Sequence, residues 1–342
     1  MRTFPFLTLP PKVCDKVLIH LSFPDLFNLA QLSKKAVKLV KIHCKSLEVP
    51  PSLSISLGSS CNVQVDHIAS RRRIRRIIWD FYHTRNPKIL DLRNPKAYKF
   101  ASRTIIFCRR GALFASPAQL TTEEIIGFIG YIKDLFKARI TLMYSDNIRM
   151  DHFHKLRSLR SFRSIGFLIV GEGRVSHEVM RQMLECRVCI ELEIKCEPAP
   201  NFVVNFPIPS RSLVVHNGSW IQKELLLNLD CRKAKLMKCT LTDENLNQFL
   251  LHWVQSDNHK LHHIIICNQN GTWDFAKIVS GLPTFPGSPK RQEASSYQEE
   301  HVAYENGLDF RRPTDGMLGT VIKSDKNEFL FVVWHVADPN LP

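Results

Sequence analysis

The chain lacks the features that would place it in a membrane or outside the cell. None of its 342 residues belongs to an apolar run of about 18 residues, the length needed to cross a bilayer. The opening residues, MRTFPFLTLPPK, carry three prolines that interrupt the apolar core of a secretion signal. We therefore expect a cytoplasmic or nuclear protein whose ten cysteines stay reduced.

Acidic residues are in short supply. The chain has 32 Asp and Glu against 47 Lys and Arg, which gives a net charge of +15 at pH 7. Such an excess is common in proteins that bind nucleic acid, but it constrains solubility and encounter more than function. With 44% hydrophobic and 23% charged residues, the composition is that of a globular protein with about two domains.

The sequence also lacks the common motifs of enzymes and metal sites. Gly171 and Gly173 are not followed by the Lys-Ser/Thr pair of a phosphate-binding loop, and no His-Glu-x-x-His or Gly-x-Ser-x-Gly is present. Cys186 and Cys189 have the spacing of half a zinc site, but no second pair follows. We predict no catalytic residue, no cofactor and no bound metal.

The first part of the chain favours three short helices. Pro11 suits a first helical turn because its missing N–H would be unpaired there, and Val13 and Val17 then follow at helical spacing. A break at residues 22–25 precedes a second helix, and a third begins after Ser33. These helices form a small all-α unit.

This pattern resembles the F-box, through which substrate receptors dock on the small Skp-family adaptor of SCF ubiquitin ligases, which bridges to a cullin. Lys12 departs from it, since many F-boxes carry an acid there. The resemblance covers residues 4–47 and implies that the adaptor-binding residues are Leu9, Pro10, Val13, Val17, Leu18, Leu21, Asp25, Leu26, Leu29 and Leu32.

The apolar residues of these helices exceed what three short helices bury by themselves. We expect a partner to cover the remaining apolar stripe, as a groove covers an amphipathic helix. An ordinary N-terminal helical cap is the simpler alternative.

Strand-like and helical runs alternate from residue 50 to residue 282. Helices are expected after the capping residues Thr121, Ser176 and Thr242 or Asp243. Most strand starts lie about 20 to 30 residues apart, near the repeat of a leucine-rich solenoid. We predict an α/β fold, a degenerate leucine-rich-like β/α solenoid after the three-helix F-box, with strands at 103–107, 139–144, 165–170, 188–194, 212–215, 234–237 and 262–267.

A second resemblance covers about residues 205–282. Trp253, Leu261 and the WDFAKIVSGL segment are similar to the type 2 F-box-associated region of a family expanded in nematodes. Residues 301–342 are similar to the closing β-hairpin of those proteins.

Two segments read as linkers and one as a turn. Residues 197–210 hold four prolines, and residues 283–300 are rich in Pro, Ser, Gln and Glu, which is typical of a flexible linker. Near the end, Asp315-Gly316 predicts a turn, and Arg311 and Arg312 are expected to line a strand edge.

A run of arginines leaves two interpretations open. Arg71, Arg72, Arg73, Arg75 and Arg76 would contact phosphates in a nucleic-acid-binding protein. Alternatively, their interleaving with Ile74, Ile77 and Ile78 predicts a half-buried strand with a solvated positive face. We favour the strand, so nucleic acid is the less expected partner.

Together these features predict a non-catalytic substrate-recognition subunit of an SCF-type ubiquitin ligase. The helices would dock on the adaptor, and the solenoid would bind a target protein that the sequence does not identify. The alternatives are a basic nucleic-acid-associated protein and an interaction scaffold that does not couple to a ligase.

Overall fold

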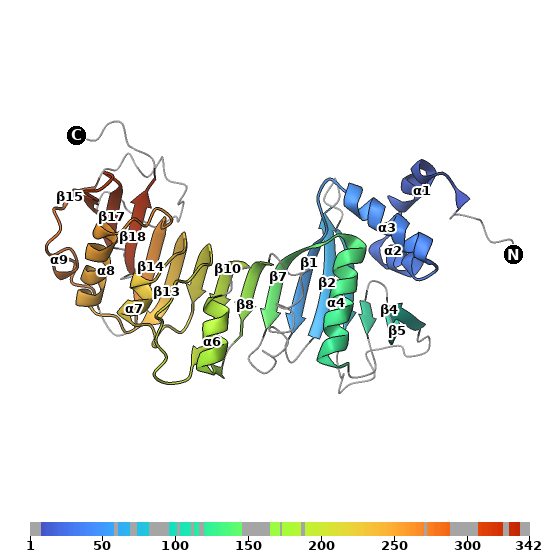
Figure 1. Cartoon of the computed structure of the whole chain (residues 1–342), viewed down its shortest axis with the longest axis horizontal. Coiled ribbons are helices and arrows are strands. Elements are labelled where there is room, and N and C mark those ends of the chain that lie inside the picture. Colours follow the sequence, from blue (N-terminus) through green and yellow to red (C-terminus); the bar gives the residue numbers. More distant parts are fainter. Residues whose placement is uncertain are drawn as a thin grey trace. The chain divides into compact units, whose positions relative to one another are not determined.

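A computed structural model gives the chain a mixed α/β fold that begins with three helices. Two compact units divide it, unit 1 (Met1–Leu168) and unit 2 (Ile169–Pro342). Figure 1 shows the elements of each. The structure describes residues 8–57, 61–68, 74–81, 96–100, 103–110, 113–115, 120–145, 165–171, 173–185, 189–269, 272–287, 307–323 and 328–335.

Unit 1 opens with the three predicted helices, α1 (Pro11–Leu18), α2 (Phe23–Ala30) and α3 (Lys34–Ser46). Local signals explain their starts. Ser22 accepts a hydrogen bond from the Asp25 amide at 3.3 Å, and Ser33 accepts one from the Ala36 amide at 3.1 Å. Each serine thereby satisfies an amide that the first helical turn leaves unpaired.

The sheet of unit 1 is mixed. Strands β1 (Ser52–Leu57), β2 (Cys61–Ile68) and β3 (Ile74–Asp80) are antiparallel neighbours, and β7 (Arg139–Ser145) runs parallel to β1. Beyond β3, β6 (Leu113–Ala115) is parallel to it, while β5 (Arg103–Arg110) and β4 (Lys96–Phe100) follow in antiparallel order.

The prediction of a β/α solenoid beginning at residue 50 is therefore wrong for unit 1. The connection between Leu57 and Cys61 is too short for the crossover that parallel strands need, so β1 and β2 form an antiparallel pair. The predicted helix after Thr121 is present as α4 (Thr122–Phe136), with a complete capping box between Thr121 and Glu124.

The N-terminal helices and the sheet share one aromatic core. The Phe27 ring lies 5.1 Å from that of Trp79 in β3, and the Phe23 ring lies 5.0 Å from that of Phe136 in α4. Phe128 of α4 packs edge-on against Trp79 at 5.3 Å. Because all five rings are buried, the helices are part of the fold of unit 1.

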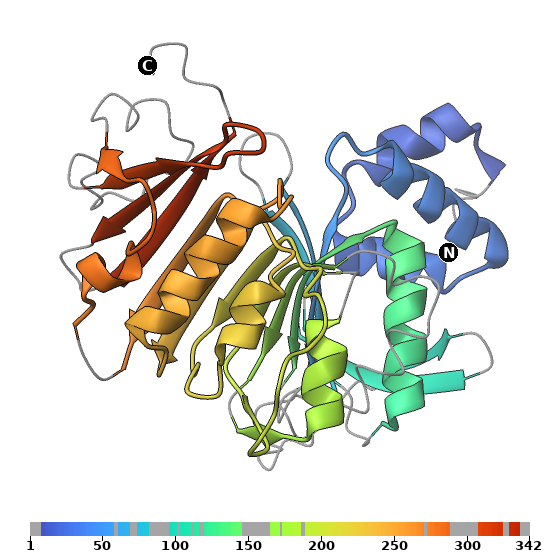
Figure 2. The same cartoon turned by 60° about the vertical axis from the view of Figure 1, so that its left-hand side comes forward.

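Unit 2 contains the predicted alternation of strand and helix. Strands β10 (Cys189–Ile194), β12 (Ser212–Val215), β13 (Lys233–Cys239) and β14 (His263–Asn268) are parallel neighbours, and β8 (Ile165–Val170) spans the division between the two units. Helices α6 (His177–Leu184), α7 (Lys223–Leu227) and α8 (Asp243–Gln255) connect them. Figure 2 shows these three helices on the same side of the strands.

Antiparallel strands complete the sheet of unit 2. Strand β18 (Glu328–Trp334) pairs with β14, followed by β17 (Leu318–Lys323), β16 (Leu308–Arg311) and β15 (Phe285–Pro286). The pair β17–β18 is thus extended by two more strands. A separate pair, β9 (Arg174–Val175) with β11 (Glu197–Pro198), and the short helix α9 (Phe275–Ile278) complete the elements.

The predicted linker at residues 197–210 is wrong. Phe202, Val204, Phe206 and Ile208 are buried, and Ile208 forms an isolated bridge with Leu229. Apolar side chains at every second residue are the signal of a packed extended segment, and the four prolines obscured it. The second predicted linker, residues 283–300, is wrong at its start, because Phe285 and Pro286 form strand β15 and pair with β16, and residues 288–300 lie outside the described residues.

Replacing Phe27 by Ala is expected to destabilise unit 1 by about 3–5 kcal/mol, because it removes a fully buried ring and leaves a cavity beside Trp79. Urea unfolding followed by circular dichroism measures the loss. Leu32→Ala, at a side chain 71% exposed, is the control and should change the free energy of unfolding by less than about 0.5 kcal/mol. Equal effects of the two substitutions would contradict the shared core.

Candidate functional site

The residues predicted to bind an adaptor fall into three groups by exposure. Leu18 and Leu26 are fully buried, so they support the helices from inside and offer no docking surface. Leu9, Leu21 and Leu29 are half-buried. The exposed members are Pro10, Val13, Val17, Asp25 and Leu32.

Exposed apolar side chains are concentrated on these helices. The described residues include eight large apolar side chains that are exposed, and six of them lie between residues 13 and 49. Val13 and Val17 are 43% and 40% exposed and lie one turn apart on the same face of α1. Exposed apolar side chains gathered in this way are typical of surfaces that a partner covers. The six are Val13, Val17, Ile19, Leu32, Ile42 and Val49.

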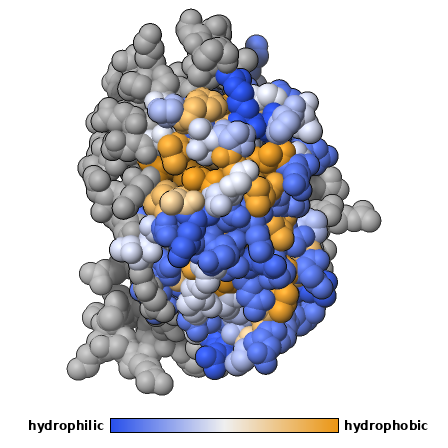
Figure 3. Space-filling model, turned by 90° about the vertical axis from the view of Figure 1, so that its left-hand side faces the viewer, coloured by the Kyte–Doolittle hydropathy of each residue, from blue (hydrophilic) through white to orange (hydrophobic). Residues whose placement is uncertain are grey.

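Another apolar area is visible on unit 2. Figure 3 turns the end with α9 and β15 toward the viewer and shows apolar residues above a hydrophilic region. Among residues 204–342, however, no large apolar side chain that the structure describes is exposed. Half-buried side chains such as Phe285 and Leu308 are the contributors available at this end. Six of the eight exposed large apolar side chains that the structure describes therefore lie between residues 13 and 49, and the other two, Ile190 and Val203, lie in unit 2.

Polar contacts fix α1 on α3. The Nδ1 atom of buried His43 lies 2.8 Å from Oδ1 of Asp15, and the Cys14 thiol donates to the Leu9 carbonyl at 3.5 Å. Lys12, the departure from the F-box pattern, is exposed on the same helix. The surface of α1 is thus presented by a helix that is held in place.

A second set of contacts joins α2 and α3 to α4. The Gln31 amide donates to the Tyr131 hydroxyl at 3.2 Å, and Lys41 pairs with Asp134. Burial raises the pKa of Tyr131. Burial alone would raise the pKa of Asp134 too, but hydrogen bonds from Lys137 and Lys41 lower it. Asp134 therefore stays ionised and keeps its pair with α3 at neutral pH.

Sequence reasoning missed several exposed residues of this surface. Ile42 is 65% exposed, although it belongs to a helix whose apolar side faces the core. The available signal was its spacing, four residues after Lys38 and three before Lys45, which places it on the lysine face. Ile19 and Val49, the other two, lie at the ends of elements, where periodicity gives no guidance.

Of the five arginines in the run at residues 71–76, the structure describes the side chain of Arg76 alone. Arg71, Arg72 and Arg73 lie outside the described residues, and Arg75 is described only by its backbone, opposite His67 in the β2–β3 ladder. Arg76 is exposed, and its Nε pairs with Asp66 at 2.7 Å. The half-buried strand predicted here is confirmed, because Ile77 and Trp79 of β3 are buried.

Unit 2 gathers cations at the edge where its parallel strands begin. We call the set Arg211, Arg232, Lys233, Lys235, His262 and His335 the basic edge. Backbone bonds place its segments side by side: the Arg232 and Lys233 amides donate to the Arg211 carbonyl at 2.9 and 3.2 Å, and the His262 amide donates to the Arg232 carbonyl at 2.7 Å.

His262 reports the electrostatics of the basic edge. Arg232 donates to its Nε2 from Nε at 3.1 Å and from Nη2 at 2.9 Å, and the His335 ring stacks on it at 4.1 Å. Burial, His335, Arg232 and two further cations lower the pKa of His262 to about 4. Burial and Lys233 lower the pKa of His263 to about 4 as well. Both imidazoles are thus neutral at pH 7.

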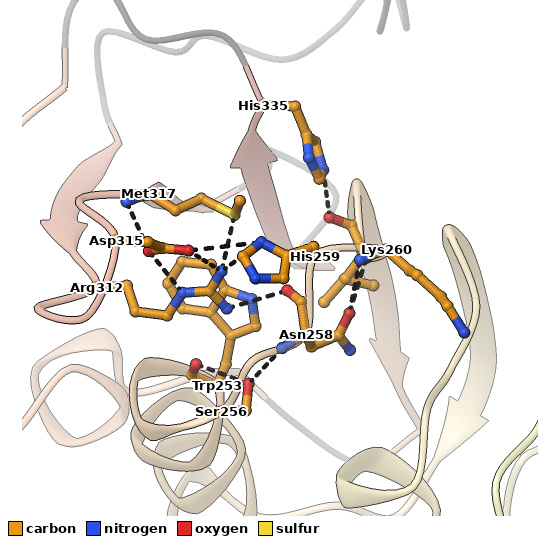
Figure 4. Close-up of polar contacts among 10 residues, drawn as sticks. Trp253, Ser256, Asn258, His259, Lys260, Arg312, Asp315, Met317 and His335 are labelled. Atoms are coloured by element: carbon orange, nitrogen blue, oxygen red, sulfur yellow. Dashed lines mark hydrogen bonds and ion pairs between the residues drawn. The ribbon is translucent and has the colours of Figure 1, made fainter.

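A buried arginine supports the loop that leads into this edge (Figure 4). Arg312 is fully buried, and it binds both carboxylate oxygens of Asp315 at 2.9 and 2.6 Å and the Asn258 carbonyl at 3.0 Å. Its guanidinium stacks 5.0 Å from the Trp253 ring. The hydrogen bonds from Arg312 lower the pKa of Asp315 to about 2.

The prediction that Arg312 lines a strand edge is wrong, because its carboxylate, carbonyl and aromatic partners compensate its burial. The expected turn at Asp315-Gly316 is present, with Gly316 at a φ of 72°, which favours glycine.

Within the described ranges, no three His, Cys, Asp or Glu side chains lie together as a metal site. Cys189 is buried in β10, and Cys186 lies outside those ranges. Burial raises the pKa of the Cys196, Cys231 and Cys239 thiols to about 12, so they are not nucleophiles at neutral pH. Within the same ranges, the helices are too short or too polar to span a bilayer.

Comparisons with known proteins agree with this arrangement. The family model described as F-box domain matches residues 6–46, and the model described as F-box associated matches residues 202–266. An uncharacterized protein of Caenorhabditis elegans is 22% identical over 97% of this chain and 79% of its own length.

Two further C. elegans proteins match parts of the chain. The Skn-1 dependent zygotic transcript 15 protein is 23% identical over 47% of this chain and 49% of its own length. The E3 ubiquitin-protein ligase hecw-1 is 41% identical over 14% of this chain and 4% of its own length. No solved structure matches.

The low pKa values of His262 and His263 predict that unit 2 loses stability as pH falls. A folded pKa of about 4 lies below the ordinary 6.5, so the stabilisation is complete above pH 6.5 and is lost as pH falls toward 4. Urea unfolding across this pH range measures it. His262→Gln should reduce the change in the free energy of unfolding with pH. His252→Gln, at an exposed position of α8, should leave that change as it is. The prediction is refuted if His262→Gln leaves the pH dependence of the free energy of unfolding unchanged.

Proposed function

The chain carries an F-box domain followed by an F-box-associated domain, and from this premise we propose that it is the substrate-recognition subunit of an SCF-type ubiquitin ligase. Helices α1, α2 and α3 dock on a Skp-family adaptor, which connects them to a cullin. Unit 2 binds the target protein. Ubiquitin transfer belongs to other subunits of the complex.

The observation that supports adaptor docking best is the concentration of exposed apolar side chains on residues 13–49. Water is a poor environment for six large apolar side chains on so short a segment, and a partner groove that covers them gains about 25 cal/mol per Å² of apolar area. Leu18 and Leu26 contribute by holding the helices together from inside.

The domain limits follow from the same proposal. The F-box takes residues 4–47, and an α/β domain extends over residues 50–282, with its F-box-associated part from about 205 to 282. Strands β15 to β18 then complete the sheet of unit 2. The leucine-rich-like character belongs to the β/α part around β10–β14, where strands are parallel and helices lie on one side.

A receptor of this kind acts by proximity. It raises the effective concentration of the target near the ligase without taking part in bond formation. The contacts of α2 and α3 with α4 and β3 suit this role, because they give the adaptor-binding helices a fixed orientation within unit 1. The partial match to a protein named as a ubiquitin ligase agrees with it.

Replacing Val13 and Val17 by Glu is expected to weaken adaptor binding at least thirtyfold, or by about 2 kcal/mol, because two charges would be buried in an apolar interface. Isothermal titration of the full chain with the purified adaptor measures the change. Replacing Leu9 and Pro10 by Ala should also weaken adaptor binding.

The matched control replaces Ile190 and Val203 by Glu. These side chains are 41% and 47% exposed, close to the 43% and 40% of Val13 and Val17, but they lie in unit 2. The control should bind the adaptor as the unchanged chain does. If the Val13/Val17 variant also retains full affinity, α1 is not the docking helix. A chain that never binds the adaptor would instead be a ligase-independent scaffold.

A further inference from the structure

The basic edge of unit 2 is a surface for which the adaptor-docking role has no use. It lies within residues 202–266, which match the F-box-associated model, apart from His335 at the end of β18. Its basic residues come from four chain segments that backbone hydrogen bonds hold side by side. This arrangement is a property of the folded sheet and not of a local run of charge in the sequence.

The sheet presents Lys233 and Lys235 of β13 on the face opposite the helices. Along β12 and β13, Leu213, Val215, Ala234 and Leu236 are buried, and α7 and α8 lie on their side of the strands. Side chains alternate across a strand, so the intervening residues face the other way. There Ser212, Val214 and Lys235 are half-buried, and Lys233 is exposed.

The described carboxylates nearby are either engaged or at a distance. Asp230 pairs with Lys260 at 2.6 Å, and Glu193 pairs with His216 at 2.8 Å and Lys195 at 3.4 Å. Glu191 lies opposite Ser212, which in turn lies opposite Lys233. Two strand spacings, about 10 Å, therefore separate Glu191 from Lys233. In the described part of unit 2, no carboxylate forms an ion pair with Lys233 or Lys235.

The low pKa of His262 supports the same conclusion. Besides burial, its causes are His335, Arg232, Lys233 and Arg211. Burial is the largest of these causes, and the positive side chains of Arg232, Lys233 and Arg211 add to it. Positive charge that disfavours a proton on His262 also favours an anionic ligand nearby.

We propose that the basic edge binds an extended acidic segment of the target protein, with two of its carboxylates at Lys233 and Lys235. This inference rests on the proposed role of unit 2 in target recognition. Lys233 and Lys235 are alternate residues of one strand, so their side chains leave the same face about 7 Å apart. Alternate side chains of an extended peptide have the same spacing.

The surroundings favour a peptide over a nucleic acid. Glu191 and Glu193 on β10 lie across β12 from the lysines, and they would repel a continuous phosphate backbone that crosses the sheet. Val214 lies between Glu193 and Lys235 in the ladder and offers an apolar contact. A peptide with acidic side chains at separate positions meets the lysines and avoids the glutamates.

The test uses the full chain and a fluorescently labelled peptide of alternating glutamate and threonine. Anisotropy should show binding that weakens as salt rises, and a peptide of alternating lysine and threonine should not bind. Lys233→Glu with Lys235→Glu should reduce the affinity for the acidic peptide at least about tenfold, because opposite-charge contacts become like-charge contacts.

The matched control is Lys223→Glu with Lys277→Glu, which changes the net charge equally but alters α7 and α9. It should retain the affinity for the peptide. Equal weakening in both variants would reduce the effect to net charge and overturn the inference, as would absence of binding to the acidic peptide. Stronger binding of single-stranded DNA, lost in the Lys233/Lys235 variant, would overturn it in favour of nucleic acid.

Adaptor binding, measured on the same samples, separates this inference from the proposed function. Loss of peptide binding with full adaptor affinity is the expected result for the Lys233/Lys235 variant. A chain that binds the peptide through these lysines but never binds the adaptor would refute the ligase role and uphold the acidic-segment site. If the glutamate variant fails to fold, Lys233→Gln with Lys235→Gln takes its place, with the thermal midpoint as the check.

Discussion

The packing of Phe23 and Phe27 against Phe136 and Trp79 is the interaction on which the amino-terminal half of the molecule depends. Three helices of eight, eight and thirteen residues are too short to be stable alone. They become stable because one side of α2 enters the core that α4 and β3 also form. Val13 and Val17 of α1 and Ile42 of α3 stay outside this core and are exposed.

The structure separates the apolar residues of the three helices into a buried group and an exposed group. These apolar residues form one set in the sequence, but they serve two purposes in the structure. Leu18, Leu26 and Phe27 are buried, whereas Val13, Val17 and Leu32 are exposed. Both groups occupy helical spacings, so periodicity alone does not separate them. Only the sheet, which comes later in the chain, decides which side of each helix becomes the core.

The sequence predicted local structure well and long-range order less well. Caps at Ser176 and Thr242 and the strands near residues 212 and 234 are present because they depend on neighbouring residues. The antiparallel start of unit 1 and the burial of Arg312 were not predicted. The antiparallel start follows from the short connection between Leu57 and Cys61, which the strand spacing of a repeat obscured. The burial of Arg312 depends on distant contacts such as that with Asn258, which no local pattern encodes.

The arginine run at residues 71–76 can be seen in the sequence, whereas the basic edge forms only when the chain folds. A run of like charges is visible in the sequence, yet Arg76 forms an ion pair with Asp66, its neighbour in the β2–β3 ladder. Arg211, Arg232 and Lys233 are spread along the chain and meet only because β12 and β13 are parallel and in register. In a parallel sheet, residues at the starts of successive strands are neighbours whatever their separation in sequence. Charge that matters for recognition is therefore found by strand register, and an excess counted over the whole chain does not locate it.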